Sequence, residues 1–165
     1  MSHHLSSTPI IVPHGATRTR APLNIVGELT HVLVNSADSA SQLAVFHLNA
    51  PPMSGPPLHV HSREDEWFYV LDGELVFEVD GIRHVVTAGG SVYLRRGLPH
   101  RYQNFTDRDA RLLIAVTPSG LDRFFEAMDA VTPPGGLPSM EQLLSLDAEF
   151  GLTTMGPPMG PEDRP

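Results

Sequence analysis

Short runs in which hydrophobic and polar residues alternate fill the middle of the chain. In residues 42–50, QLAVFHLNA, the alternation has a period of two, so Phe46 and His47 point to opposite faces of an extended strand. A period of two predicts a strand with one buried face. Similar strand-like runs occupy residues 23–34, 67–71, 74–79, 82–87, 91–94, 100–105 and 110–118.

Glycine, proline and aspartate separate these runs. Asp80 and Gly81 form a dipeptide that favours a type I′ turn, which predicts a hairpin between residues 74–79 and 82–87. The segment PPMSGPP, residues 51–57, is incompatible with a helix or a central strand and predicts a rigid connection. Many short strands with regular turns indicate an all-β fold, closed as a barrel or packed as a sandwich.

The periodicity changes to that of helices after the last strand-like run. Residues 119–130 carry an apolar stripe at helical spacing, with Ser119 as the expected N-cap. A second helical stretch, residues 139–150, begins with a capping box formed by Ser139 and Gln142 and ends before a glycine. We therefore expect two C-terminal α-helices beside the β domain.

The chain divides into three parts by composition. Residues 1–20 are rich in serine, threonine, proline and histidine and are expected to be a flexible N-terminal segment. Residues 21–150 are long enough for a single domain with its own core, including the two helices. Residues 151–165, rich in glycine and proline, are expected to be a disordered tail.

Charge and cysteine content narrow the possible partners. The net charge is −8, which argues against nucleic acid and anionic membranes as partners. The sequence contains no cysteine, so a bound metal must be held by His, Asp or Glu. No run approaches the roughly 20 apolar residues of a membrane span, and the N-terminus lacks a secretory signal, so we expect a cytoplasmic protein.

Histidines and acids gather in residues 58–66, LHVHSREDE. In an extended strand His59 and His61 point the same way and offer two imidazoles to one ion. A His-x-His pair alone is a weak signal, because such pairs also occur at solvated surfaces. Of the three acids that follow, Glu64 and Asp65 are interpreted as solvated loop residues.

Two blocks of residues at fixed spacing resemble the motifs of the cupin superfamily, small jelly-roll barrels. The first block matches G-x5-H-x-H-x(3,4)-E-x6-G through His59, His61, Glu66 and Gly73. The second matches G-x5-P-x-G-x2-H-x3-N through Gly89, Gly97, His100 and Asn104. The resemblance covers roughly residues 42–117.

The sequence departs from these motifs at two positions. Met53 stands where the first motif begins with glycine, and Arg95 stands at the proline of the second motif. Neither position supplies a metal ligand in the family, so only the local loops are expected to differ.

The resemblance implies a double-stranded β-helix that holds one divalent transition metal ion, Fe, Ni, Co, Mn or Zn. Its ligands would be His59, His61, Glu66 and His100, and Glu66 would also serve as a general base. An open site of this kind can polarise an oxygen-bearing substrate and admit O₂. The family also leads us to expect a homodimer.

Apolar and aromatic residues near the motifs suggest a flat phenolic or enolic ligand. The resemblance to small quercetinase-like proteins implies a dioxygenase. Cupin polyketide cyclases and a non-catalytic small-ligand-binding cupin are the alternatives, and the sequence does not separate them. The candidate pocket residues are Phe46, His47, Met53, Phe68, Phe77 and Phe105.

Overall fold

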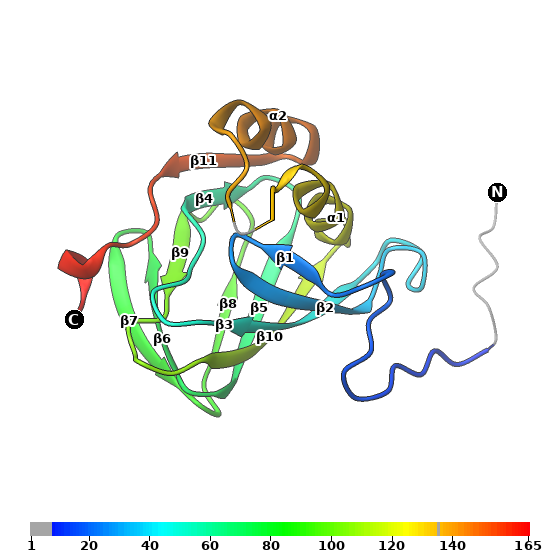
Figure 1. Cartoon of the computed structure of the whole chain (residues 1–165), viewed down its shortest axis with the longest axis horizontal. Helices are drawn as coiled ribbons and strands as arrows, with labels where there is room; N and C mark the ends of the chain where they lie inside the picture. The colour runs from blue at the N-terminus through cyan, green and yellow to red at the C-terminus, as the bar shows by residue number, and fades with distance from the viewer. Residues whose placement is uncertain (1–7, 135) are drawn as a thin grey trace.

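Two β-sheets face each other in a computed structural model that describes residues 8–134 and 136–165 (Figure 1). The first sheet has six strands in the order β1-β2-β3-β10-β5-β8. These are β1 (Leu23–Ile25), β2 (Glu28–Val34), β3 (Ala44–Ala50), β5 (Asp65–Asp72), β8 (Ser91–Leu94) and β10 (Ala110–Thr117).

The second sheet has five strands in the order β11-β4-β9-β6-β7. They are β4 (Leu58–His61), β6 (Glu74–Val79), β7 (Ile82–Thr87), β9 (His100–Gln103) and β11 (Leu152–Gly156). The chain crosses repeatedly between the sheets, since β4 and β5 are neighbours in sequence but lie in different sheets. This is the predicted all-β jelly-roll architecture.

The core lies between the two sheets. Along β3 the even positions are buried and the odd ones are not, as the alternation predicted. Phe46 and Leu112 from the first sheet and Phe77 from the second have essentially no exposed surface. His47 is consequently on the outer face, where it pairs across the strands with His31.

The predicted hairpin between β6 and β7 is confirmed. Asp80 and Gly81 both have positive φ values, 49° and 78°, which the type I′ turn requires. The run at residues 23–34 forms two strands, because Val26 and Gly27 make a turn with positive φ values of 47° and 91°.

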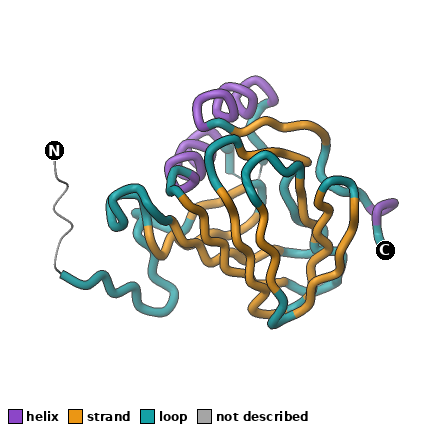
Figure 2. The backbone as a smooth tube through the Cα atoms, turned by 180° about the vertical axis from the view of Figure 1, so that it is seen from behind, coloured by secondary structure: helices purple, strands orange, loops and turns teal. Residues whose placement is uncertain are grey.

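The two helices cover one end of the barrel, α1 (Leu121–Val131) and α2 (Met140–Phe150) (Figure 1). Figure 2 shows them together at that end, with the strands running away from them. The capping box of Ser139 and Gln142 is present in α2. Ser119 is not the N-cap of α1, because Gly120 occupies that position and Ser119 is buried with Ser36.

The expectation of a disordered tail over residues 151–165 is wrong. Leu152–Gly156 form β11, which pairs antiparallel with β4. Beyond it, Met159 is buried against Val76 and Phe105, and a short 3-10 helix, η1 (Pro161–Asp163), lets Asp163 pair with Arg83. These partners are distant in sequence, so local composition did not reveal them.

The expected flexible segment 1–20 is described only in part, since residues 1–7 lie outside the described residues. Residues 8–20 contain no helix or strand, but Arg18 is held at its backbone by Val32 and at its side chain by Asp38. In the part of the chain that the structure describes, no helix has the length and apolarity needed to cross a membrane.

Candidate metal centre

Three strands bring the four predicted ligands together. His59 and His61 lie on β4, His100 lies on β9, and Glu66 comes from β5 in the opposite sheet. His59 pairs directly with His100 in the ladder between β4 and β9. One ligand atom from each of the four side chains lies within 4.8 Å of the others.

The rings are oriented by backbone carbonyls. The Nδ1 atom of His59 lies 2.8 Å from the carbonyl oxygen of Pro57, and that of His100 lies 2.9 Å from the carbonyl oxygen of Leu98. A carbonyl oxygen can only accept a hydrogen bond, so Nδ1 carries the hydrogen in both rings. In the neutral rings the Nε2 lone pairs then point to the centre of the cluster.

The converging atoms lie at short distances. The Nε2 atoms of His59 and His61 are 3.1 Å apart. Glu66 Oε2 lies 2.9 Å from His100 Nε2 and 3.3 Å from His61 Nε2. Lone pairs of two neutral imidazoles and a carboxylate repel one another unless a proton or a cation lies among them. Three imidazole nitrogens and one carboxylate oxygen suit a divalent transition metal, so the residues fit such an ion.

Electrostatics favour the ligating forms of two members. Burial, reinforced by His100 and His61, lowers the pKa of His59 to about 3, so this ring is neutral at pH 7. Burial alone would raise the pKa of Glu66. The neighbouring His61, His100 and His59 lower it by more, so the pKa falls to about 2. For His61 burial lowers the pKa, while Glu66 and Glu64 raise it above its usual value.

Glu64 is not the solvated loop residue that the sequence suggested. Its side chain is buried, and its Oε2 atom lies 3.4 Å from Nδ1 of His61. Neither atom makes a hydrogen bond with a described residue, so the contact between them is an ion pair at this distance. The N-terminal end of α1 packs against the Glu64 side chain. A Cβ added at Gly120, the N-cap residue, would lie 2.9 Å from Glu64 Oε1. A carboxylate at Nδ1 orients a ligating histidine, which assigns Glu64 to the surroundings of the centre.

Asp65, by contrast, faces outward as expected. Its carboxylate accepts hydrogen bonds from the backbone and side chain of Arg96, and these bonds lower its pKa to about 2. It therefore holds the loop after β8 and takes no part in the cluster.

The remaining motif positions are structural. The Gly97 amide donates to the carbonyl oxygen of His61 over 2.8 Å, which ties the loop before His100 to β4. The buried Asn104 side chain donates to the carbonyls of Ala50 and Arg108. Met53 has a φ of 60°, the left-handed conformation that glycine adopts freely, which explains the glycine of the family motif.

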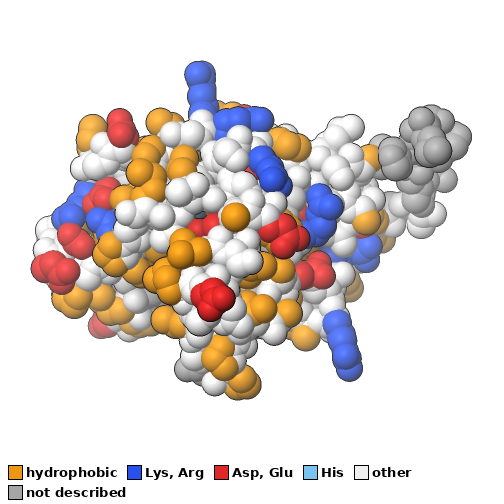
Figure 3. All heavy atoms as spheres, turned by 90° about the horizontal axis from the view of Figure 1, so that it is seen from above, with side chains coloured by type: hydrophobic (Ala, Val, Ile, Leu, Met, Phe, Trp, Pro, Cys, Tyr) orange, Lys and Arg blue, Asp and Glu red, His pale blue; other side chains and the backbone are white. Residues whose placement is uncertain are grey.

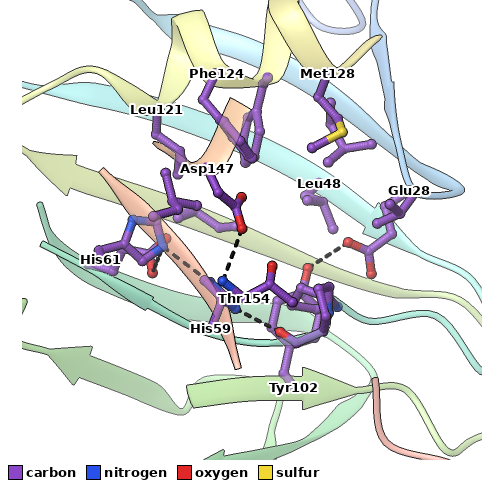
Figure 4. Close-up of a pocket in the computed structure, with 18 of the residues that line it drawn as sticks. Glu28, Leu48, His59, His61, Tyr102, Leu121, Phe124, Met128, Asp147 and Thr154 are labelled. Atoms are coloured by element: carbon purple, nitrogen blue, oxygen red, sulfur yellow. Dashed lines mark hydrogen bonds and ion pairs between the residues drawn. The ribbon is translucent and has the colours of Figure 1, made fainter. Parts of the chain in front are cut away.

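A cavity opens beside the cluster, between the barrel end and the two helices (Figure 4). Its volume is about 100 Å³, close to the scale of one small aromatic ring. His59, His61 and Glu66 form part of its wall. The rest is mainly apolar and includes Leu48, Phe68, Ile114, Leu121, Phe124 and Met128.

Of the predicted pocket residues, only Phe68 lines this cavity. Phe46 and Phe77 are buried in the core, where Phe46 contacts Phe125 and Phe77 contacts Phe68. The other three lie elsewhere. His47 is on the outer sheet face, Met53 is exposed, and Phe105 packs with Val76 and Met159.

Sequence reasoning missed several cavity residues. The stripe of α1 faces inward over the barrel mouth, so Leu121, Phe125 and Met128 line the cavity. Two acids also line it, Glu28 from β2 and Asp147 from α2. The sequence offered no motif around either acid, and only their burial marks them.

Two facing sheets with a cluster of three histidines and one glutamate define the cupin class. Residues 46–116 match the cupin domain family. Over these residues the chain is similar to cupin domains, and it is also similar to a quercetin 2,3-dioxygenase and to a tetracenomycin polyketide synthase protein.

Curated relatives match limited parts of the chain. Quercetin 2,3-dioxygenase of Bacillus subtilis is 28% identical over 93 residues, which cover 56% of this chain and 27% of that protein. A beta-D-galactosidase of Mycobacterium tuberculosis is 46% identical over 55 residues, 33% of this chain and 47% of the relative. The tetracenomycin polyketide synthase protein TcmJ of Streptomyces glaucescens is 26% identical over 99 residues, 59% of this chain and 66% of the relative. The chain thus spans less than half of the length of the first two relatives.

Solved structures share the fold. The crystal structure of a predicted oxalate decarboxylase from Thermotoga maritima aligns with a TM-score of 0.59 at 23% identity. The alignment covers 66% of this chain and 99% of that one. At this identity the likeness supports the cupin fold alone.

Proposed function

We propose that this protein is a metal-dependent enzyme that acts as a dioxygenase on a small phenolic or enolic aromatic molecule. One observation carries the proposal: three imidazole nitrogens and a carboxylate oxygen converge in the wall of a mainly apolar cavity. The similarity to quercetin 2,3-dioxygenase, whose name gives an aromatic substrate and a reaction with O₂, supports it.

Each residue of the cluster has a role in this proposal. His59, His61, His100 and Glu66 would hold one divalent ion, which supplies Lewis-acid polarisation of a ligand oxygen. Glu66 accepts the proton that a phenol or enol loses on binding. Its pKa of about 2 makes it a weak base, so it accepts a proton only from a hydroxyl whose own pKa is lowered at the site.

The cavity limits the size of the ligand. Its volume of about 100 Å³ is below the roughly 300–1,000 Å³ typical of pockets for drug-sized ligands. A single ring is therefore the natural occupant. A molecule with several fused rings needs α1 to move away, because Leu121, Phe124 and Met128 close the cavity on that side (Figure 4).

The test compares wild type with Glu66→Gln on a panel of phenolic and enolic compounds, in an oxygen electrode and with the bound metal quantified. Glutamine keeps the size and one oxygen donor but removes the base. We expect turnover per bound metal to fall roughly 10²-fold or more. Turnover that simply follows metal content would show that Glu66 acts only as a metal ligand and not as a base.

The panel also includes a galactoside, because the chain is similar to the Mycobacterium protein.

A polyketide cyclase is the second candidate, and the similarity to the polyketide synthase protein TcmJ over 66% of that protein favours it. Consumption of an aromatic polyketide precursor at equal rates with and without O₂ would select the cyclase. Tight binding of a phenolic ligand with no turnover under either condition would select a non-catalytic binding module.

A further inference from the structure

Glu28 is a carboxylic acid in an otherwise apolar stretch of the cavity wall. It begins β2, its exposed fraction is 1%, and it lines the same cavity as the histidine cluster. Among the described residues no cation forms an ion pair with it. A buried carboxylate without a cation is costly, so its presence calls for a reason beyond packing.

Two hydroxyl groups hold this acid. Tyr102 donates its hydroxyl hydrogen to Glu28 Oε2 over 2.6 Å, and Ser54 donates to Oε1 over 2.9 Å. Burial raises the pKa of Glu28 to about 7, although these two hydrogen bonds oppose the shift. The group can thus accept a hydrogen bond as a carboxylate or donate one as a carboxylic acid near neutral pH.

The Glu28 carboxylate can accept further hydrogen bonds. A carboxylate offers about four lone-pair sites, and the two hydroxyl groups occupy two of them. Figure 4 shows Glu28 and His61 at opposite ends of the drawn pocket, with Leu48 and Met128 near Glu28 and Leu121 nearer His61. The cavity therefore has a polar group at each end, with Leu48, Met128 and Leu121 along one side and Asp147, which accepts a hydrogen bond from the Thr154 amide, between the two ends.

We propose that Glu28 and Tyr102 bind a second oxygen atom of the ligand, whose first oxygen lies at the histidine cluster. The cavity then selects a single aromatic ring that carries hydroxyl or carbonyl groups at two positions. Glu28 and Tyr102 are specificity-determining residues in this arrangement, which rests on the proposed function for the binding of the first oxygen.

The experiment measures binding to zinc-loaded protein under anaerobic conditions by calorimetry. The probes are two isosteric pairs in which a methyl group replaces a hydroxyl: 4-methylphenol with 1,4-dihydroxybenzene, and 3-methylphenol with 1,3-dihydroxybenzene. An apolar cavity prefers the methyl member, because a hydroxyl costs more to desolvate. We expect wild type to bind the dihydroxy member of at least one pair more tightly, by roughly tenfold.

The double variant Glu28→Leu/Tyr102→Phe removes both partners together, so neither is left buried and unpaired. In it the affinity ratio of the preferred pair should fall to about one or below. Tyr69→Phe, which changes a tyrosine outside the cavity lining, is the matched control and should keep the wild-type ratio. If the double variant fails to bind zinc, the single variant Tyr102→Phe takes its place in the test. Its affinity ratio for the preferred pair should be at least roughly threefold lower than that of wild type.

Two results would overturn the inference while leaving the proposed function intact. One is binding of the phenols by wild type without preference for either dihydroxy member. The other is an unchanged ratio in the variants. If no phenol binds zinc-loaded wild type, or binding survives in His59→Ala/His61→Ala, the proposed function fails and the inference falls with it.

Discussion

Three consecutive acids, Glu64, Asp65 and Glu66, occupy three different environments. Glu66 points between the sheets to His100, Glu64 reaches His61 from the far side of its ring, and Asp65 binds Arg96 outside. Motif spacing predicted the position of Glu66. It did not predict that of Glu64, because the burial of this side chain depends on α1, which lies more than fifty residues later in the sequence.

The first prediction concerns Glu64. If its carboxylate orients His61 through Nδ1, Glu64→Gln should weaken metal binding by about 10–100-fold without unfolding the protein. Competition with a chromophoric chelator measures this affinity. Asp65→Asn is the matched control, since it changes the adjacent acid on the outer side, and it should leave the affinity near that of wild type. Equal affinities in all three proteins would contradict the role of Glu64.

The second prediction concerns pH and Glu28. Its pKa is raised from an ordinary value of 4.5 to about 7 in the folded protein. A raised pKa means that the folded state binds more protons, so its stabilising contribution is complete below pH 4.5 and is lost as pH rises through 7. The loss amounts to on the order of 3 kcal/mol.

Glu28→Gln does not titrate and should escape this loss. The free energy of unfolding of the variant, relative to wild type, should therefore increase between pH 5 and pH 8, as denaturant titrations at several pH values would measure. A difference between the two proteins that is constant over this range would show that Glu28 does not titrate there.

At the scale of elements, β11 holds β4 in place, a role that was not predicted from the sequence. It forms the outer neighbour of β4, with Thr154 paired to His59 and Leu152 paired to His61. The backbone amide and the hydroxyl of Ser62 both donate to the Gly151 carbonyl and fasten the loop after β4 to the end of α2. The strand that carries two of the candidate ligands is thus held by the C-terminal segment.

The third prediction follows from this contact. Truncation after Gly151 removes β11 and the buried side chains of Leu152 and Met159. We expect the melting temperature to fall by roughly 5–15 °C and metal affinity to weaken, because β4 loses its neighbour. Truncation after Gly160 is the control, since it spares β11 and Met159 and should cost far less. An unchanged melting temperature after truncation at Gly151 would mean that β11 does not contribute to stability.

Local signals predicted the elements that local interactions determine. The β6–β7 hairpin follows from Asp80 and Gly81, and the start of α2 follows from the Ser139–Gln142 box. The C-terminal strand was missed because proline and glycine dominate its surroundings, while its pairing partner lies about ninety residues away. The inward orientation of α1 was missed for the same reason, since its stripe does not reveal what it covers.

At the scale of the whole molecule, the cluster joins the two sheets. His59, His61 and His100 belong to one sheet and Glu66 to the other, so an ion held by all four links both layers. The helix-covered end seen in Figure 3 shows hydrophobic side chains between scattered charges, and Leu137, Met140 and Leu144 are exposed in α2 and the loop before it. That end encloses the cavity beside the cluster.

The fourth prediction is that this link stabilises the fold. An ion that binds only the native state raises stability by mass action, so removal with a chelator should lower the melting temperature by several degrees. The barrel should stay folded, because its core of side chains such as Phe46, Phe77 and Leu112 does not depend on the ion. Circular dichroism during heating, with and without chelator, measures both effects. Complete unfolding at room temperature on chelation would contradict the second of them.

The central claim is that His59, His61, Glu66 and His100 hold one divalent transition metal ion, and metal content per chain tests it most directly. Elemental analysis of protein purified without chelator and dialysed should find about one ion per chain in wild type. The double variant His59→Ala/His61→Ala should lose it, because only one imidazole and one carboxylate of the cluster remain. A double variant that retains the full metal content of wild type would contradict the assignment of the site.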